Sequence, residues 1–270
     1  MILDIHGAPA YAYTGGKPFE PALPTVVLIH GAQNDHSVWA LQSRYLAHHG
    51  YSVLALDLPG HGRSSGPALT TVEAMAGWLV DVMEAAGVQR AILAGHSMGS
   101  LIALETAHRA PGVVAGLALL GSTYPMKVAS TLLETARTDE AAAIDMVNVW
   151  SHSSIAHKPS FPGPGFSVMG GARRLMQRMS ARNPDQLFYT DFAACNGYAN
   201  GEAACAGLAC PVLFVFGSND VMTPPRSTKL LTGLLDHGRI VTVDAGHQMM
   251  AEAPDAVLDA LAGFAAAALR

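Results

Sequence analysis

The chain has 270 residues, with 16 lysines and arginines against 21 aspartates and glutamates, and half of its residues are hydrophobic. This hydrophobic fraction, with only 14% charged residues, excludes an intrinsically disordered chain. The formal net charge of −5 also argues against a nucleic-acid partner, because neutralising phosphates requires an excess of basic side chains. The length is that of one large domain, or of one domain with an insertion.

The spacing of the cysteines and the length of the apolar runs indicate the cellular compartment of the protein. Cys195, Cys205 and Cys210 lie within 16 residues and include no C-x-x-C pair, which disfavours a zinc site, a redox motif and a disulfide framework. The N-terminal residues lack the basic and apolar stretches of a secretion signal. Apolar runs such as Val113–Gly121 are shorter than the ~18–20 residues that cross a bilayer. We therefore expect a soluble, cytoplasmic protein without a membrane partner, and make no prediction of its oligomeric state.

Short apolar runs rich in β-branched residues alternate along the chain with longer segments of helical periodicity. Each run is apolar almost throughout, which is typical of a strand covered on both faces. The expected strands are Thr25–His30, Tyr51–Leu56, Ala91–Ala94, Val113–Leu120, Pro211–Phe216 and Arg239–Val243. The expected helices are Ser37–His49, Thr71–Ala86, Met98–Arg109, Pro225–Leu235 and Pro254–Leu269. This alternation predicts an α/β fold with a mostly parallel sheet.

The alternation stops between Ser122 and Cys205, where no buried-strand pattern is present. Because a structureless connection of about 80 residues is rare, we expect helices within this segment. Ser160–Phe166 contains two prolines and two glycines and is expected to be a loop. We therefore assign residues 1–121 and 207–270 to the core and residues 122–206 to an inserted helical cap.

Gly95-His-Ser-Met-Gly99 matches the pattern G-x-S-x-G, directly after an expected strand and at the start of an expected helix. In that context a sharp turn presents the serine side chain, and the small glycines allow the chain segments to cross closely. The alternative is an ordinary tight turn in which Ser97 is a helix N-cap. A catalytic serine needs a base, and that base needs an acid to orient it.

Candidates for the base and the acid follow later strands, because sites in open α/β sheets form at the carboxyl ends of the strands. Asp220 follows the strand that ends at Phe216, and His247 follows the strand that ends at Val243. The order Ser97, Asp220, His247 is the serine–acid–histidine order of one particular fold and differs from both major serine-protease orders. Asp244 is too close in sequence to His247 to orient its ring well.

Several stretches together resemble the α/β-hydrolase superfamily over essentially the whole chain. They are His30-Gly31, Asp57-Leu-Pro-Gly-His-Gly-Arg-Ser64, Gly95–Gly99, Gly217-Ser-Asn-Asp220 and Gly246-His247. The resemblance implies the α/β-hydrolase fold, a mostly parallel central sheet flanked by helices with an inserted helical cap. It also implies that Ser97 is the nucleophile, that His247 is the general base and then acid, and that Asp220 holds His247 in its working tautomer.

The same resemblance implies an oxyanion hole formed by the backbone N–H groups of Ala32 and Met98. The loop reads His-Gly-Ala-Gln from position 30, whereas many lipases and esterases have several glycines there. Asp57, an alternative acid, is implied to be structural together with Arg63, organising the turn Pro59–Gly62. No carboxylate follows the strand ending at Leu120, where another acid position would lie.

The remaining histidines are expected to be structural or exposed. His30, His61 and His96 lie inside the matching stretches, where loop packing and hydrogen bonding are the favoured interpretation. Neither His48-His49 nor His152 with His157 has an acidic residue at metal-ligand spacing. We expect no metal site. Without a Walker loop or a G-x-G-x-x-G after the first strand, we also expect no cofactor.

Within the expected cap, Arg174, Arg178 and Arg182 would share one helical stripe. A solvated helix face is the favoured interpretation, and binding of a substrate carboxylate or phosphate is the alternative. The opposite side of that helix would then be buried, with Leu175, Met176 and Met179 facing the sheet or the substrate.

These features predict a serine hydrolase that cleaves an ester-like bond of a small or medium organic molecule through an acyl-enzyme. Carbon–carbon bond hydrolases and cofactor-free haloperoxidases of the superfamily share the triad and remain alternatives, as does a non-catalytic ligand receptor on this fold. Epoxide hydrolases and haloalkane dehalogenases are disfavoured, because they need an aspartate at the position of Ser97. We expect the cap to set selectivity through apolar side chains, namely Met126, Trp150, Phe161, Phe166, Met169 and Met176.

Overall fold

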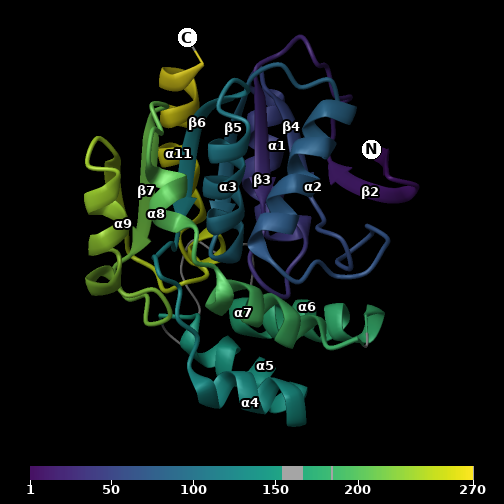
Figure 1. Ribbon diagram of the computed structural model, residues 1–270, viewed down its shortest axis with the longest axis vertical. Coiled ribbons are helices and arrows are strands. Elements are labelled where there is room, and N and C mark those ends of the chain that lie inside the picture. The colour runs from purple at the N-terminus through teal and green to yellow at the C-terminus, as the bar shows by residue number, and fades with distance from the viewer. Residues whose placement is uncertain (154–166, 184, 270) are drawn as a thin grey trace.

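The computed structural model describes residues 1–153, 167–183 and 185–269. Within this part of the chain, the strands form one sheet of eight in the order β1-β2-β4-β3-β5-β6-β7-β8 (Figure 1). Neighbouring strands pair parallel from β4 to β8, whereas β1–β2 and β2–β4 are antiparallel. The strands are β1 (Ile2–Ile5), β2 (Ala8–Tyr13), β3 (Thr25–Ile29), β4 (Ser52–Leu56), β5 (Ala91–His96), β6 (Val114–Leu120), β7 (Val212–Gly217) and β8 (Arg239–Val243). The mostly parallel α/β sheet expected from the sequence is confirmed.

The burial of the six expected strands agrees with the sequence prediction for all except β8. Every residue of β3 to β7 is buried, as the unbroken apolar runs predict. Strand β8 lies at the edge of the sheet, and Ile240 on it is 54% exposed. The expectation that this strand is covered on both faces is therefore wrong, because an apolar run does not reveal which helices lie over it.

Strands β1 and β2 were not among the expected elements. They form a hairpin at the other edge of the sheet, joined through the positive-φ residues His6 and Gly7. Only Ile5, Ala10 and Ala12 are buried in these two strands, so neither contains the continuous apolar run that identifies the inner strands.

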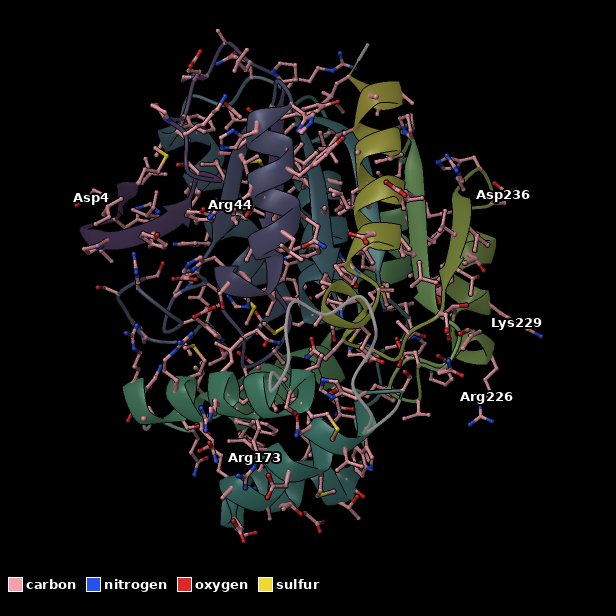
Figure 2. All side chains as sticks on the ribbon, turned by 180° about the vertical axis from the view of Figure 1, so that it is seen from behind. Asp4, Arg44, Arg173, Arg226, Lys229 and Asp236 are labelled. Atoms are coloured by element: carbon pink, nitrogen blue, oxygen red, sulfur yellow. The ribbon has the colours of Figure 1, made fainter. Side chains whose placement is uncertain are left out.

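Helices cover both faces of the sheet. Helices α2, α3 and α8 lie on one face, where Leu79 and Leu101 belong to the same buried cluster as residues of β3 to β7 (Figure 1). Helices α1 and α11 lie on the opposite face, which Figure 2 shows with Arg44 on α1. The bounds are α1 (Ala40–His48), α2 (Val72–Ala85), α3 (Met98–Arg109), α8 (Gly201–Cys205) and α11 (Pro254–Ala268).

Short helical segments complete the core. The expected helix at Pro225–Leu235 is divided in two, and a turn of helix not expected from the sequence directly precedes α11. These segments are η1 (His36–Trp39), η2 (Pro225–Ser227), α9 (Lys229–Leu234) and α10 (Met249–Glu252).

In its described part, the segment between β6 and β7 contains helices joined by turns and irregular stretches, and no strand. Helices α4 to α7 lie beyond the carboxyl ends of the parallel strands and share a small buried cluster that includes Ile144, Met176 and Phe188 (Figure 1). Helix α8 instead contributes Ala204 to the cluster of α3 on the sheet. The first four are α4 (Ser130–Thr138), α5 (Glu140–Trp150), α6 (Val168–Arg182) and α7 (Leu187–Gly197). The expected loop Ser160–Phe166 lies outside the described residues, and the cap boundaries at 122 and 206 stay a prediction.

Across the described ranges, no helix combines the length and the apolar character that a bilayer span requires.

Candidate active site

Ser97 occupies a strained turn between β5 and α3. Its backbone has φ 53° and ψ −119°, a left-handed conformation that costs a residue other than glycine on the order of 1–3 kcal/mol. A Cβ atom at Gly95 would lie 2.0 Å from the carbonyl oxygen of Gly99, and one at Gly99 would lie 2.3 Å from that of Ile29. Only glycine therefore permits this crossing. Ser97 makes no side-chain capping bond to α3, which disfavours its interpretation as an ordinary N-cap.

Asp220 lies in the loop after β7, where two residues following it complete its hydrogen bonds. Its Oδ1 accepts the backbone N–H groups of Met222 and Thr223 at 2.8 and 2.9 Å. Its Oδ2 accepts the Thr223 hydroxyl at 2.7 Å and Nδ1 of His247 at 2.8 Å. Burial alone would raise the pKa of Asp220, but His247 and these bonds hold the pKa well below its usual range. The carboxyl group is therefore ionised.

His247 lies in the loop after β8 and is 3% exposed. Because its Nδ1 donates to Asp220, the proton resides on Nδ1 in the neutral ring, and Nε2 is left as the basic nitrogen. Nε2 is buried and has no hydrogen-bond partner among the described residues. Ser97 and His247 line the same cavity, so an unpaired base and a serine hydroxyl share one space.

His96, directly before Ser97, connects the serine turn to the histidine loop. Its Nε2 donates to the backbone carbonyl of His247 at 2.8 Å, and the two rings lie 4.7 Å apart. Burial, followed by the nearby His247, lowers the pKa of His96 to about 3. The ring of His96 is therefore neutral at neutral pH.

The loop after β3 lies against the serine turn, since a Cβ atom at Gly31 would lie 3.1 Å from Cβ of Ser97. Among the described residues, the backbone N–H groups of Ala32 and Met98 have no acceptor. The carbonyl of Gly31 accepts Nδ1–H of His30 at 2.8 Å, while Nε2 of His30 accepts the N–H of Leu58 at 3.2 Å. This ring is neutral, because burial above all lowers the pKa of His30 to about 4. The expectation that His30 and His96 pack and hydrogen-bond within loops is confirmed.

The alternative acids have other partners. Asp57 accepts the backbone N–H and the ring Nδ1 of His36 on one oxygen, and the backbone N–H of Arg63 on the other. The structural role expected for Asp57 and Arg63 is therefore confirmed. Asp244 is exposed and accepts the side-chain amide of Asn219 at 3.1 Å.

Asp35, His36 and Asp57 form the group of metal-ligating side chains that the described residues bring together. Asp35 accepts the backbone N–H of Ser37 and pairs with Arg178 at 2.8 Å, and Asp57 is hydrogen-bonded as above. These protein donors already occupy the carboxylates, so the group acts as a hydrogen-bonding network between the loops and α6.

The arginine stripe joins α6 to the core. Arg178 pairs with Asp35, and Nη1 of Arg182 donates to the carbonyl of Gly62. The favoured interpretation as a solvated face is therefore incomplete, because two of the three guanidinium groups bind core loops. On the opposite side of α6, Met176 and Met179 are buried as expected.

The cavity that contains Ser97 and His247 has a volume of about 260 Å³. Of the side chains expected to line it, Met126 and Trp150 do so, and Met176 lines a smaller adjoining space that also reaches Ser97. Met169 borders neither space, and Phe161 and Phe166 lie outside the described residues. The remaining lining residues are Ala32, Lys127, Val128, Ala129, Leu132, Phe192, Cys195, Val221, Met222 and Thr223.

Two residues of this region were not recognised in the sequence. Thr223 donates two hydrogen bonds to Asp220, and the spacing Asp-x-x-Thr after a strand is a local signal for this contact. Asp191 on α7 accepts hydrogen bonds from Gln33, in the loop after β3, and from His61. No local pattern predicts this role, because these partners are 158 and 130 residues away in the sequence.

The fold is that of an α/β protein with a mostly parallel sheet, and Ser97 and His247 line one cavity of it. A model of the family described as alpha/beta hydrolase fold matches residues 24–254, and the chain belongs to this family, with its fold.

Relatives in the family cover the chain to different extents. The (E)-2-((N-methylformamido)methylene)succinate hydrolase of Acinetobacter baylyi is 25% identical over 87% of this chain and 88% of that protein. The dihydrolipoyllysine-residue acetyltransferase component of the acetoin cleaving system of Cupriavidus necator is 42% identical, over 41% of this chain and 28% of that protein. The structure of the enol-lactonase of Burkholderia xenovorans superposes with a TM-score of 0.83 at 23% identity, covering 98% of this chain and 99% of the other.

Proposed function

We propose that the protein is a serine hydrolase that cleaves an ester-like bond of a small or medium organic substrate, with Ser97, His247 and Asp220 as its catalytic triad. One observation carries the proposal. The ionised Asp220 accepts a hydrogen bond from Nδ1 of His247, while Nε2 on the other side of the ring has no partner among the described residues. His247 and Ser97 line the same cavity. A strained serine, a free base and an orienting acid are the parts that covalent acyl transfer requires.

In the proposed reaction, Nε2 of His247 takes the hydroxyl proton as Oγ of Ser97 attacks the substrate carbonyl carbon. The negative charge on the carbonyl oxygen is stabilised by the free N–H groups of Ala32 and Met98. The imidazolium, stabilised by Asp220, then returns its proton to the leaving group, and an acyl-enzyme is formed. Water deprotonated by His247 attacks this ester in the second half of the reaction, and Ser97 is regenerated.

The proposed size range rests on the cavity. At about 260 Å³ it falls just below the 300–1,000 Å³ usual for small-molecule sites, and its lining is mainly aliphatic, aromatic and sulfur-containing. Leu132, Trp150 and Phe192 come from the helices between β6 and β7. We therefore propose that this segment acts as the roof that selects short acyl groups, and that the substrate is a small molecule.

The decisive test is covalent labelling with a fluorophosphonate, followed by peptide mapping. One label per chain on Ser97 is expected, and Ser97→Ala should abolish it. Ser122→Ala is a matched control, since Ser122 is buried close by and bonds to Ser100 rather than to substrate. Labelling that persists in Ser97→Ala would show that another residue is the nucleophile.

A substrate panel distinguishes the remaining activities. We expect turnover of activated carboxylic esters, measured beside thioesters, lactones, carbon–carbon ring-cleavage products and halogenation assays. Ligand-induced thermal stabilisation without turnover of any of these would instead favour a receptor on this fold.

A further inference from the structure

Asp191 on α7 is fully buried and binds two loops of the core at once. Its Oδ2 accepts the backbone N–H of Gln33 at 2.7 Å and Nε2 of His61 at 2.8 Å. Its Oδ1 is buried without a hydrogen-bond partner among the described residues. Gln33 directly follows Ala32, so a carboxylate of the inserted segment holds the loop that contains a proposed oxyanion donor.

The peptide units on both sides of Ala32 have fixed orientations. The unit between Gly31 and Ala32 is held at its carbonyl by His30. The unit between Ala32 and Gln33 is held at both ends, because Ala32 O accepts the side-chain amide of Asn34 at 3.0 Å and Gln33 N–H donates to Asp191. Gln33 has φ 56°, a conformation that a residue other than glycine keeps only where its surroundings enforce it.

The hydrogen bond between His61 and Asp191 is strengthened by charge. Both ring nitrogens of His61 face acceptors, Asp191 on Nε2 and the carbonyl of Pro59 on Nδ1 at 3.1 Å, so the ring donates from both when it is protonated. Burial opposes protonation, but Asp191, Pro59 and Asp57 together raise the pKa of His61. His30, whose ring lies 4.8 Å away, faces His61 as a neutral ring.

We propose that Asp191 is a positioning residue: with His61 as its counter-ion, it fixes the peptide units around Ala32 so that the free N–H points at the oxyanion. The inserted segment would thereby complete the oxyanion hole in addition to roofing the cavity. This inference rests on the proposed serine-hydrolase function. Asp191 touches neither substrate nor the triad in this arrangement, and acts only through the loop.

The test compares Asp191→Ala with Tyr198→Phe. Tyr198 follows the same helix and donates a buried hydrogen bond to Glu105 at 2.9 Å, so its substitution loosens α7 from the core without touching Gln33 or His61. For a p-nitrophenyl ester, we expect Asp191→Ala to lower kcat on the order of 10²-fold with KM within threefold, as for a lost oxyanion donor. Tyr198→Phe should keep kcat within threefold of the wild type.

Amide hydrogen exchange provides a second readout that does not depend on turnover. Exchange of the Gln33 N–H should accelerate at least tenfold in Asp191→Ala and remain unchanged in Tyr198→Phe. If Asp191→Ala does not fold, Asp191→Asn replaces it, since this variant keeps the shape and an acceptor oxygen but loses the charge. Because neutral bonds are roughly half as strong, kcat should then fall by about tenfold.

The results separate the two proposals. Unchanged Gln33 exchange, or a kcat equal to that of Tyr198→Phe, would overturn the role of Asp191. A wild-type chain that neither reacts with a fluorophosphonate nor hydrolyses esters would overturn the proposed function, and the exchange comparison would still decide whether Asp191 holds the loop.

Discussion

The ring of His96 donates a hydrogen bond to the backbone carbonyl of His247 at 2.8 Å, which links the residue before the proposed nucleophile to the proposed base. Both rings are buried, and Gly121 packs against both. A Cβ atom at Gly121 would lie 3.0 Å from the ring of His247 and 3.4 Å from the ring of His96. The serine turn and the histidine loop come from strands β5 and β8, at separated places in the sheet. This bond is therefore a direct restraint on the distance between the two loops.

Replacing His96 with phenylalanine keeps a planar ring but removes the donor. The carbonyl of His247 would be left buried without its partner, and we expect the free energy of unfolding to fall by about 1–3 kcal/mol. We also expect kcat to fall about tenfold with little change in KM, since the base would be less well positioned. Urea unfolding and steady-state kinetics measure both effects, with the exposed His49→Phe as control. Full activity in His96→Phe would show that the bond does not position His247.

Replacing Asp220 with asparagine should preserve the fold but favour the wrong tautomer of His247. We expect kcat to fall on the order of 10⁴-fold, the size of the effect in the serine-protease template. The matched comparison is Asp57→Asn, which removes another buried carboxylate that binds His36 and Arg63 instead. If Asp57→Asn reduced kcat more than Asp220→Asn at an unchanged melting temperature, the acid would be assigned to the wrong residue.

The His61–Asp191 pair predicts a pH dependence of stability. Because the folded-state pKa of His61 is raised, the stabilisation is fully present below about pH 6.5, the ordinary value, and is lost as pH rises through the raised pKa. The difference in unfolding free energy between the wild type and His61→Gln should therefore be largest at pH 6 and shrink toward pH 9. Denaturant unfolding at a series of pH values measures it. A difference that grows with pH would contradict a protonated His61 in the native state.

Local patterns were sufficient to predict the core of the fold and the three candidate triad residues. Each inner strand is an apolar run almost throughout. Ser97 and Asp220 follow two of these inner strands, β5 and β7, and His247 follows the edge strand β8. In a parallel sheet the carboxyl ends of β5, β7 and β8 lie at the same end of the sheet. Ser97 and Asp220, 123 positions apart, and Asp220 and His247, 27 positions apart, therefore converge there.

The remaining features depend on contacts that no local pattern specifies. The hairpin of β1 and β2 has few buried residues, and Ile240 on the edge strand β8 is 54% exposed. The bonds of Asp191 to His61 and Gln33 join α7 to loops more than 100 residues earlier. Such contacts follow from how the inserted helices dock on the core, and a single sequence does not reveal that docking.

The size of the cavity predicts which acyl chains the protein accepts. Over a series of p-nitrophenyl esters, kcat/KM should peak at short acyl chains and fall for long ones, because a space of about 260 Å³ lacks room for them. Trp150 lines this cavity from α5, so Trp150→Ala should move the maximum toward longer chains. Its neighbour Val149 is 58% exposed and is not among the residues that line the cavity, so Val149→Ala should leave the profile unchanged. Because the sequence of residues 122–205 contains no long apolar stretch, the rate should also pass smoothly through the micelle concentration of the substrate. A wild-type maximum at long chains, or a jump in rate above that concentration, would instead identify the helices between β6 and β7 as a lipase lid.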